Sequence, residues 1–272
     1  MKFGFYTPNF DIFGDARLLA DLAHEAEDAG WDGFFIWDHL LFKEPVVDAW
    51  IALTAMAVRT RRIRIGPLVT PVPRRHIGKL AREVVSLDHL SGARVILGVG
   101  AGYPHLADYG AFGDAGDPKT RAAKLDEGLE VLAGLWSGEP VSHRGVHYQV
   151  ECSGLQTALQ QPRTPVWVAA AWPSTRPIRR AANWDGVVPV GVRGLEVEPQ
   201  DLAAIVAQVR ELRGSGTDFD IIRFGVTRDA GDTALVRACA EAGATWWIED
   251  GYTQDRSLEQ ARRRLHQGPP QL

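Results

Sequence analysis

The sequence predicts an α/β protein that folds as a parallel (β/α)8 TIM barrel, and three observations lead to this prediction. Short apolar runs recur at intervals of 30, 30 and 32 residues, opening at Phe3, Gly33, Ile63 and Val95. This interval fits one strand, one crossover helix and two short loops. Four further strand-like runs follow at Val166–Ala170, Gly186–Val190, Ile221–Thr227 and Thr245–Ile248. The 272 residues are close to the roughly 250 of a typical barrel of this kind. An open doubly wound sheet is the main alternative.

Amphipathic patterns connect the early strands. After the first strand, one stripe of apolar residues recurs at helical spacing, comprising Leu19, Leu22, Ala23, Ala26 and Ala29. A similar stripe precedes the fourth strand, comprising Ile77, Leu80, Ala81, Val84 and Leu87. Gly92 follows it and is predicted to end that helix in a left-handed conformation.

The strand-like runs are continuously apolar and do not alternate with polar residues. Examples are Phe34–Trp37, Val95–Leu97 and Val166–Val168. Strands of this type are typical of a parallel sheet that is covered on both faces. The pattern therefore favours a barrel whose outside is covered by helices.

The second half contains five helical patterns, at about Thr120–Trp136, Thr175–Asn183, Asp201–Arg213, Asp232–Ala242 and Ser257–Gln267. Two stretches break the rhythm. Residues of about 100–118 show no clear period, and residues of about 140–150 resemble a hairpin. We interpret both as an insertion after the fourth strand of a single domain that spans residues 1–272, because long excursions in compact domains are usually functional or disordered.

Composition limits the possible classes of function. With 45% hydrophobic and 24% charged residues, the chain can bury a full core. A net charge of −4 and a pI near 6.1 argue against nucleic acid as a partner, because phosphate binding usually needs a basic face. No apolar run approaches the roughly 20 residues of a membrane span, and no export signal opens the chain, so we expect a cytoplasmic protein. Cys152 and Cys239 lie far apart, which gives no support for a disulfide or a metal site.

The barrel prediction nominates residues for chemistry, because the active site of such a barrel lies at the carboxyl ends of its strands. These ends carry Thr7, Pro8, Asn9, Asp38, His39, Leu68, Val69, Thr70, Gly98, Gly100, Ala101, Gly102, Ala170, Ala171, Ser174, Thr175, Gly191, Arg193, Thr227, Arg228, Glu249 and Asp250. The set has no HxH pair, no dense carboxylate cluster and no lysine, which argues against metal-dependent hydrolysis and Schiff-base chemistry. Small residues, amides and hydroxyls instead suit a flat, partly apolar cofactor with a phosphate at one edge, and a small-molecule substrate.

Six segments, in the same order along nearly the whole chain, resemble the luciferase-like family of flavin- and deazaflavin (F420)-dependent oxidoreductases. They are AEDAGWDGFFIWDHL (Ala26–Leu40), RTRRIRIGPLVTPVPRRH (Arg59–His76), LDHLSGARVILGVGAG (Leu87–Gly102), HRGVHYQV (His143–Val150), PVWVAA (Pro165–Ala170) and WDGVVP (Trp184–Pro189). The resemblance implies a TIM barrel that binds FMN or F420 at the carboxyl ends of its strands. It also implies a bulge after the third strand, with a non-prolyl cis peptide at Leu68–Val69, and a possible homodimer.

On this basis we predict the site residues. Cofactor contacts are assigned to Asn9, Leu68, Val69, Thr70, Gly100, Ala101, Gly102, Ala170, Ala171, Ser174 and Thr175, the last four of them near the phosphate. Catalytic roles are assigned to Asp38 and His39, which match the DH pair of the family, in which the histidine lies by the ring. An imidazole with an ordinary pKa of about 6.5 suits proton transfer.

Several alternatives stay open at this point. The enzyme could be a dehydrogenase or a monooxygenase. A barrel hydrolase or lyase could use Asp38, Glu249 or Asp250 as its acid or base, and a noncatalytic cofactor-binding barrel would need no catalytic group. Arg74, Arg75 and His76 could meet the acidic tail of F420 or could simply be solvated.

Overall fold

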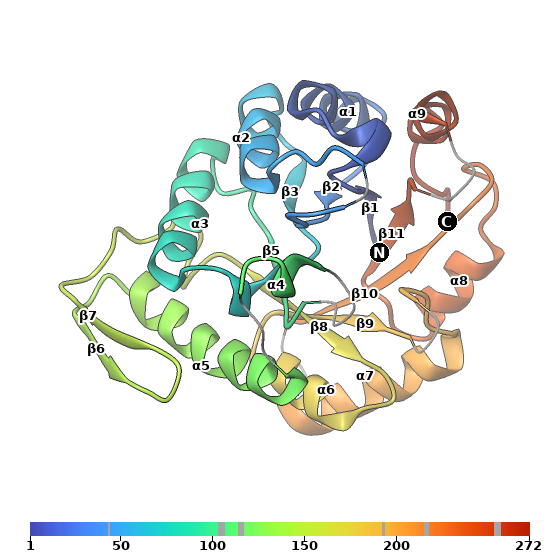
Figure 1. Ribbon diagram of the computed structural model, residues 1–272. Helices are drawn as coiled ribbons and strands as arrows, with labels where there is room; N and C mark the ends of the chain where they lie inside the picture. The colour runs from blue at the N-terminus through green and yellow to red at the C-terminus, as the bar shows by residue number, and fades with distance from the viewer. Residues whose placement is uncertain (43, 103–106, 114–116, 192–193, 215–217, 253–256) are drawn as a thin grey trace.

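Parallel strands form a ring at the centre of the molecule, and helices surround it (Figure 1). The computed structural model describes residues 1–272 apart from 43, 103–106, 114–116, 192–193, 215–217 and 253–256. Arg193 therefore lies outside the described residues, as does part of the predicted insertion. The barrel strands are β1 (Lys2–Thr7), β2 (Gly33–Ile36), β3 (Arg64–Pro67), β4 (Thr70–Pro71), β5 (Leu97–Gly100), β8 (Val166–Ala171), β9 (Gly186–Val190), β10 (Asp220–Gly225) and β11 (Trp246–Asp250).

These nine strands hydrogen-bond in the order β3-β2-β1-β11-β10-β9-β8-β5-β4, and the neighbours run parallel. The ring closes where β3 meets the residues just before β5. Ile65 pairs with Val95, and the Ile96 N–H donates to the Ile65 carbonyl at 3.0 Å. The predicted barrel is thus confirmed, and the open sheet is excluded.

The third predicted strand is divided into β3 and β4, which is why nine strands replace the expected eight. A cis peptide at Leu68–Val69 lies at the division, as the family resemblance implied. Beyond it, Thr70 and Pro71 pair with Val99 and Gly100 of β5. The Leu68 N–H still donates to the Ile36 carbonyl of β2 at 2.8 Å, so the strand is interrupted only after this bond, at the Leu68–Val69 peptide.

Helices lie between successive strands and cover the outside of the ring (Figure 1). They are α1 (Ala16–Asp28), α2 (Ala49–Arg59), α3 (Ile77–Ser91), α4 (Ala107–Gly110), α5 (Pro118–Trp136), α6 (Thr175–Ala181), α7 (Pro199–Arg213), α8 (Ala234–Glu241) and α9 (Leu258–His266), with 3-10 turns η1 (Asp11–Phe13) and η2 (Val72–Arg74). The five helices predicted in the second half begin and end within two residues of these bounds. Gly92 ends α3 with φ 71°, which is the predicted left-handed stop.

Local sequence signals explain several helix starts. Asp15, Asp48 and Asp117 precede α1, α2 and α5, and each side chain accepts two backbone N–H groups of the first turn. Ser257 and Gln260 form a capping box at the start of α9. These caps satisfy donors that have no partner within the helix.

Two apolar layers form the core of the protein, one inside the barrel and one between the barrel and the helices. The interior is packed by side chains from many strands, and its members include Phe35, Trp167, Trp246 and Ile248, all nearly or fully buried. A larger cluster lies between the strands and the helices, with Phe34, Trp247 and Leu80 among its members. Most strand residues are buried on both faces of the sheet, as the continuous apolar runs predicted.

A two-stranded antiparallel hairpin, β6 (Val141–Arg144) and β7 (Gln149–Cys152), projects from the outside of the barrel beside α5 (Figure 1). Glu127 of α5 fixes it, because this carboxylate accepts the backbone N–H groups of His147 and Tyr148 and contacts His143 Nε2 at 3.1 Å. Among the described helices, none is long and apolar enough to cross a membrane.

Barrel closure predicts the effect of Gly66→Ala. A Cβ atom at this position would lie 1.8 Å from the carbonyl oxygen of Ile96, so the backbone contact that closes the ring would have to open. We expect a loss of about 3 kcal/mol or more in the free energy of unfolding, at the upper end of overpacking effects. Urea unfolding followed by circular dichroism measures it. The control is Gly134→Ala in α5, where the new Cβ meets only ordinary contacts and alanine favours the helix. Equal stability of the two variants would contradict this account of closure.

The ionised side chain of Glu27 is expected to contribute to the free energy of unfolding in a way that depends on pH. The side chain of this buried residue of α1 accepts the backbone N–H groups of Arg61 and Ile63 at 3.0 and 2.8 Å. Burial acts to raise its pKa, but these hydrogen bonds and that of Arg62 outweigh burial and lower the pKa. A lowered pKa stabilises the fold above the unfolded value of about 4.3, and the contribution is lost as pH falls through the folded value.

We therefore expect Glu27→Gln to cost about 1–3 kcal/mol at pH 7, and the difference from the wild type to narrow below about pH 4. Unfolding curves from pH 3 to pH 8 check this, with the exposed Glu130→Gln as control. A difference that is the same at every pH would rule out a role for the charge.

Candidate active site

The carboxyl ends of β1, β2, β4 and β5 bring the predicted site residues to one rim of the barrel. Asn9 lies two residues beyond β1, and its side-chain amide donates to the carbonyl oxygens of Val47 and His39 at 2.7 and 3.2 Å. Asn9 thus ties the segment after β1 to the segment after β2. Two of the predicted residues, Asn9 and His39, are therefore neighbours.

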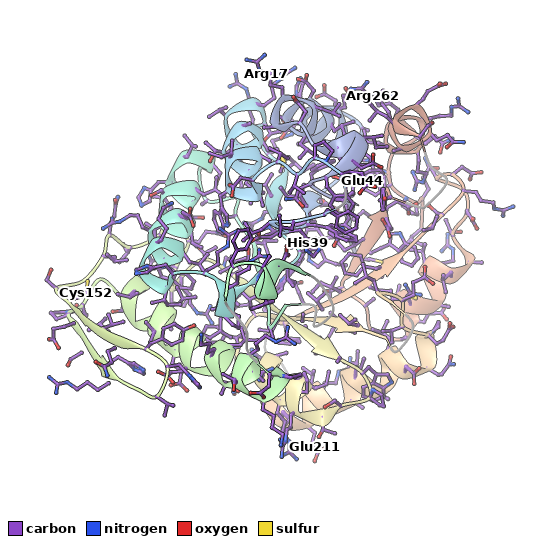
Figure 2. All side chains as sticks on the ribbon, in the orientation of Figure 1. Arg17, His39, Glu44, Cys152, Glu211 and Arg262 are labelled. Carbon is purple, nitrogen blue, oxygen red and sulfur yellow. The ribbon has the colours of Figure 1, made fainter. Side chains whose placement is uncertain are left out.

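His39 lies near the centre of the molecule in Figure 2, close to the short helix α4. Its side chain is 16% exposed, and its ring lies among aromatic rings: Trp37 at 5.3 Å, Phe42 at 6.1 Å and Phe10 at 6.2 Å between centroids. Phe42 stacks on Phe10 at 3.6 Å. One edge of the imidazole is therefore packed, while part of the ring stays accessible.

Asp38 is fully buried and is engaged on both oxygens. Oδ2 accepts the Thr70 hydroxyl at 2.8 Å, and Oδ1 accepts Arg74 Nη2 at 3.0 Å and also pairs with Arg75. The two arginines therefore form buried or partly buried ion pairs; the alternative that they are simply solvated is wrong, whereas His76 is exposed. With a side chain that is 0% exposed, Asp38 links β2, β4 and η2.

Asp108 of α4 joins the same cluster. Oδ2 lies 2.9 Å from His39 Nδ1 and 2.6 Å from Arg74 Nη1, and Oδ1 accepts the Leu41 N–H at 2.7 Å. Burial acts to raise the pKa of Asp108, but the bonds from His39 and Leu41 and the charge of Arg74 lower it below its ordinary value. The carboxyl group is therefore ionised at neutral pH.

No sequence pattern marks Asp108, because it lies in the aperiodic stretch after β5. Arg74 is one of the cations that follow the third strand, but nothing in its local sequence indicates that two carboxylates surround it. The roles of Asp108 and Arg74 become apparent only from the folded structure, in which the segments after β2, η2 and α4 are in contact.

Leu68 and Val69 form the bulge between β3 and β4, and Thr70 is the first residue of β4. The buried Tyr6 hydroxyl donates to the Leu68 carbonyl oxygen at 2.7 Å, and burial, with a further effect of Asp250, raises the pKa of Tyr6 well above 10. Tyr6 therefore stays a donor at neutral pH. Val69 is only partly buried, so its side chain borders the rim.

Gly100, Ala101 and Gly102 follow at the end of β5. A Cβ atom on Gly100 would lie 2.9 Å from Val69 Cγ2, so the absence of a side chain lets the bulge approach this strand. Gly102 has φ 79°, a conformation that favours glycine. The Tyr109 hydroxyl donates to the Ala101 carbonyl at 2.9 Å and connects this loop to α4.

Ala170, Ala171, Ser174 and Thr175 lie at the end of β8 and the start of α6. Ala170 is buried, whereas Ala171, Ser174 and Thr175 are exposed. Ser174 is the N-cap of α6 but makes no side-chain capping bond. The assignment of a phosphate to these four residues stays a prediction.

Glu249 does not join the site at the rim. Its buried carboxylate accepts the N–H and hydroxyl of Thr227, both at 2.8 Å, and pairs with Arg264 of α9. Asp250 accepts the Tyr252 N–H at 2.9 Å, and Arg228 is exposed and pairs with Asp232. Glu249 and Arg228 thus pair with groups outside the cluster of His39, Asp38 and Asp108.

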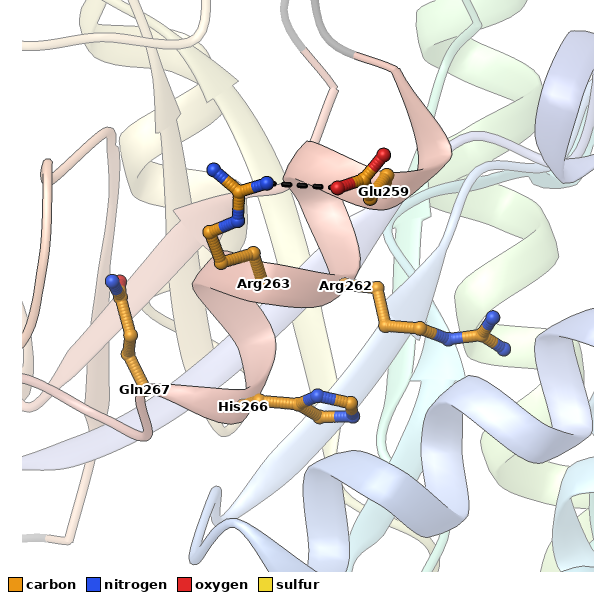
Figure 3. A pocket seen from close by; sticks show the side chains of 5 residues that line it. All are labelled: Glu259, Arg262, Arg263, His266 and Gln267. Atoms are coloured by element: carbon orange, nitrogen blue, oxygen red, sulfur yellow. Dashed lines mark hydrogen bonds and ion pairs between the residues drawn. The ribbon is translucent and has the colours of Figure 1, made fainter.

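A surface pocket on α9 is also distinct from the site. Its lining comprises Glu259, Arg262, Arg263, His266 and Gln267 (Figure 3). Arg263 pairs with Glu259, and both Arg262 and His266 pair with Glu25. Its charged groups are thus already paired. Within the described part of the chain, no group of three or more His, Cys, Asp or Glu side chains could hold a metal ion.

The sequence is similar to those of several F420-dependent glucose-6-phosphate dehydrogenases. An F420-dependent glucose-6-phosphate dehydrogenase of Amycolatopsis mediterranei is 30% identical over 214 residues, which are 76% of this chain and 62% of that protein. One of Intrasporangium calvum is 31% identical over 233 residues, covering 79% of this chain and 67% of its own. The chain spans 55% to 65% of the length of the first three such relatives.

Solved structures share the fold. The coenzyme F420-dependent tetrahydromethanopterin reductase of Methanopyrus kandleri superposes with a TM-score of 0.78 at 18% identity, covering 98% of this chain and 96% of that chain. The oxygenating constituent of 3,6-diketocamphane monooxygenase of Pseudomonas putida, in complex with FMN, superposes with a TM-score of 0.68 at 18% identity, covering 83% and 67%. The family model described as luciferase-like monooxygenase matches residues 1–268. This match extends over nearly the whole barrel, and the chain therefore belongs to the luciferase-like monooxygenase family.

Proposed function

We propose that this protein is a flavin- or F420-dependent oxidoreductase that transfers a hydride or reducing equivalents between the cofactor and a small organic substrate. The observation that carries the proposal is the position of His39, a partly exposed imidazole on the carboxyl rim of a luciferase-like barrel and beside an aromatic wall. Family membership supports the oxidoreductase class, because the curated relatives are named as dehydrogenases.

Two buried polar atoms support a fit to such a cofactor. Asn9 Oδ1 and Trp37 Nε1 find no hydrogen-bond partner among the described residues. One is an acceptor and the other a donor, and buried polar groups of this kind normally have partners. A flat ring with N–H and C=O groups along one edge would supply both, and an aromatic wall suits its faces.

The protein's own residues would bind and orient the ring. Val69 of the bulge and Thr70 of β4, with Asn9 and the glycines after β5, would hold it, and Ser174 and Thr175 would face its phosphate. When bound, the cofactor supplies the hydride chemistry. His39 would accept or return the substrate proton at the imidazole, and its aromatic neighbours would limit access of water. Asp38 would act by fixing Arg74 and Thr70, because its two carboxylate oxygens accept from these side chains.

F420 is the first candidate among the two cofactors. The relatives that are about 30% identical are named as F420-dependent, whereas the FMN complex shares 18% identity. We do not assign the relatives' substrate, glucose 6-phosphate, to this chain, because the chain matches only part of their length. Monooxygenase activity with FMN is the second candidate, favoured by the family description.

The hydrolase or lyase alternative loses two of its three acid–base candidates, since Asp38 and Glu249 have fully buried side chains in ion pairs, whereas Asp250 is only partly buried. A noncatalytic cofactor carrier would bind the cofactor without turnover.

We further propose one domain over residues 1–272, because the sheet continues from β1 to β11. A cytoplasmic homodimer stays a prediction; Ile51 and Val58, both exposed on α2, could contribute to a subunit contact.

Cofactor binding is the first test of the proposal. Titration of the purified protein with F420 and with FMN, followed by fluorescence, is expected to give micromolar or tighter binding of at least one cofactor. Turnover of a panel of small alcohols, ketones and aldehydes then separates an enzyme from a carrier. If neither cofactor binds at micromolar concentrations, the proposed function is wrong.

The role of His39 is the second test. His39→Ala is expected to lower kcat by about 10²–10⁴-fold, the usual contribution of a positioned acid–base group. Cofactor affinity should change little, because the imidazole acts on the substrate proton. The control is His24→Ala on the outer face of α1, where the imidazole pairs only loosely with Asp28 at 3.7 Å. Unchanged turnover in His39→Ala would remove His39 from the mechanism.

A further inference from the structure

We infer that Asp108 is a positioning residue that holds His39 in the tautomer with hydrogen on Nδ1, so that Nε2 carries the free lone pair. This inference rests on the proposed function, because it assigns a task within the proton transfer that His39 would perform. Asp108 itself is 2% exposed and acts through the imidazole.

The tautomer follows from the donors around one carboxylate. An ionised carboxylate can only accept hydrogen bonds, so the contact of 2.9 Å between Asp108 Oδ2 and His39 Nδ1 requires a hydrogen on Nδ1. A neutral imidazole that carries its hydrogen on Nδ1 has an unprotonated Nε2. Nε2 is then the atom that can accept a proton.

The charged groups around His39 compensate one another. Two carboxylates, Asp38 and Asp108, face two guanidinium groups, Arg74 and Arg75. These four charges sum to zero, so the cluster is balanced in charge without His39. A proton taken up by Nε2 would still be stabilised by the adjacent Asp108.

The orientation of Asp108 is set from its other side. Oδ1 accepts the N–H groups of Leu41 and Leu40 at 2.7 and 3.2 Å, which directs Oδ2 to His39 and Arg74. The same carboxylate therefore fixes the backbone after His39 and the ring of His39. Since Asp108 comes from the chain after β5 and His39 from the chain after β2, the base is assembled by two separate strand ends.

This arrangement predicts the result of Asp108→Asn. Two backbone N–H groups, of Leu40 and Leu41, face the position of Oδ1, and one Arg74 Nη1 faces the position of Oδ2. We expect the two backbone donors to keep the amide oxygen at the position of Oδ1, so that the amide nitrogen displaces Arg74 Nη1 and faces His39 Nδ1. A donor at this position favours hydrogen on Nε2, which is the opposite tautomer. We expect kcat to fall by about 100-fold or more, within the range for loss of a carboxylate that fixes a catalytic histidine.

The test is long-range ¹H–¹⁵N NMR of the full-length protein with labelled histidine. The chain has eight histidines, and the spectrum of His39→Ala assigns the signal of His39. We expect a protonated Nδ1 and an unprotonated Nε2 in the wild type at pH 8, and the reverse in Asp108→Asn. This readout requires neither cofactor nor turnover.

A matched control exists in the second carboxylate–histidine pair. Glu127 lies 3.1 Å from His143 Nε2 and also accepts two backbone N–H groups, but it holds the hairpin outside the barrel. Glu127→Gln is expected to change the His143 signal and to leave the His39 signal and kcat unchanged.

Three results would overturn the inference: hydrogen on Nε2 of His39 in the wild type, an unchanged His39 tautomer in Asp108→Asn, or full kcat in Asp108→Asn with a reversed tautomer. The first needs no variant, so it applies even if Asp108→Asn fails to fold. If the tautomers behave as expected but no variant or wild type turns over any substrate, the positioning by Asp108 stands and the proposed function fails.

Discussion

The close backbone contact between β3 and the start of β5 is the constraint on which the rest of the structure depends. Without a side chain on Gly66, the Ile65 carbonyl can accept the Ile96 N–H and turn a curved sheet into a ring. Closure directs all the strand carboxyl ends to one rim, and it leaves the interior to be filled by Phe35, Trp167 and Trp246. The positions of Asn9, Asp38 and His39 follow from this geometry, because each lies within three residues of a strand end. Asp108 is reached from the same rim but lies on α4.

The second constraint is electrostatic. Asp38, Arg74 and Asp108 have side chains that are at most 2% exposed, and removal of one member of such a group commonly costs about 3–5 kcal/mol. These charges persist because each is paired and hydrogen-bonded. They also connect the chain after β2 with η2 and α4, so the same interactions that compensate buried charge determine the surroundings of His39.

Much of the fold was predictable from the sequence, and there is a physical reason why the division of the third strand and the role of Asp108 were not. Continuous apolar runs and helical stripes predicted the barrel, and the second-half helices fell within two residues of their bounds. The division of the third strand at Leu68–Val69 came only from the family resemblance, because no local pattern marks it. Asp108 was not predictable, since its stretch has no period and its partners are 34 and 69 residues away. Sequence patterns report local conformation, whereas ion pairs between loops depend on how the ring closes.

The pairing of β1 with β11 has a consequence for biosynthesis. Lys2 lies opposite Trp246 and Tyr6 opposite Asp250, so one edge of the earliest strand lacks its backbone partner until nearly 250 residues have been made. Contacts between such distant segments form slowly, because a long loop must close first. During translation, the nascent chain therefore carries an unpaired, aromatic strand edge that is prone to aggregation until β11 has been made.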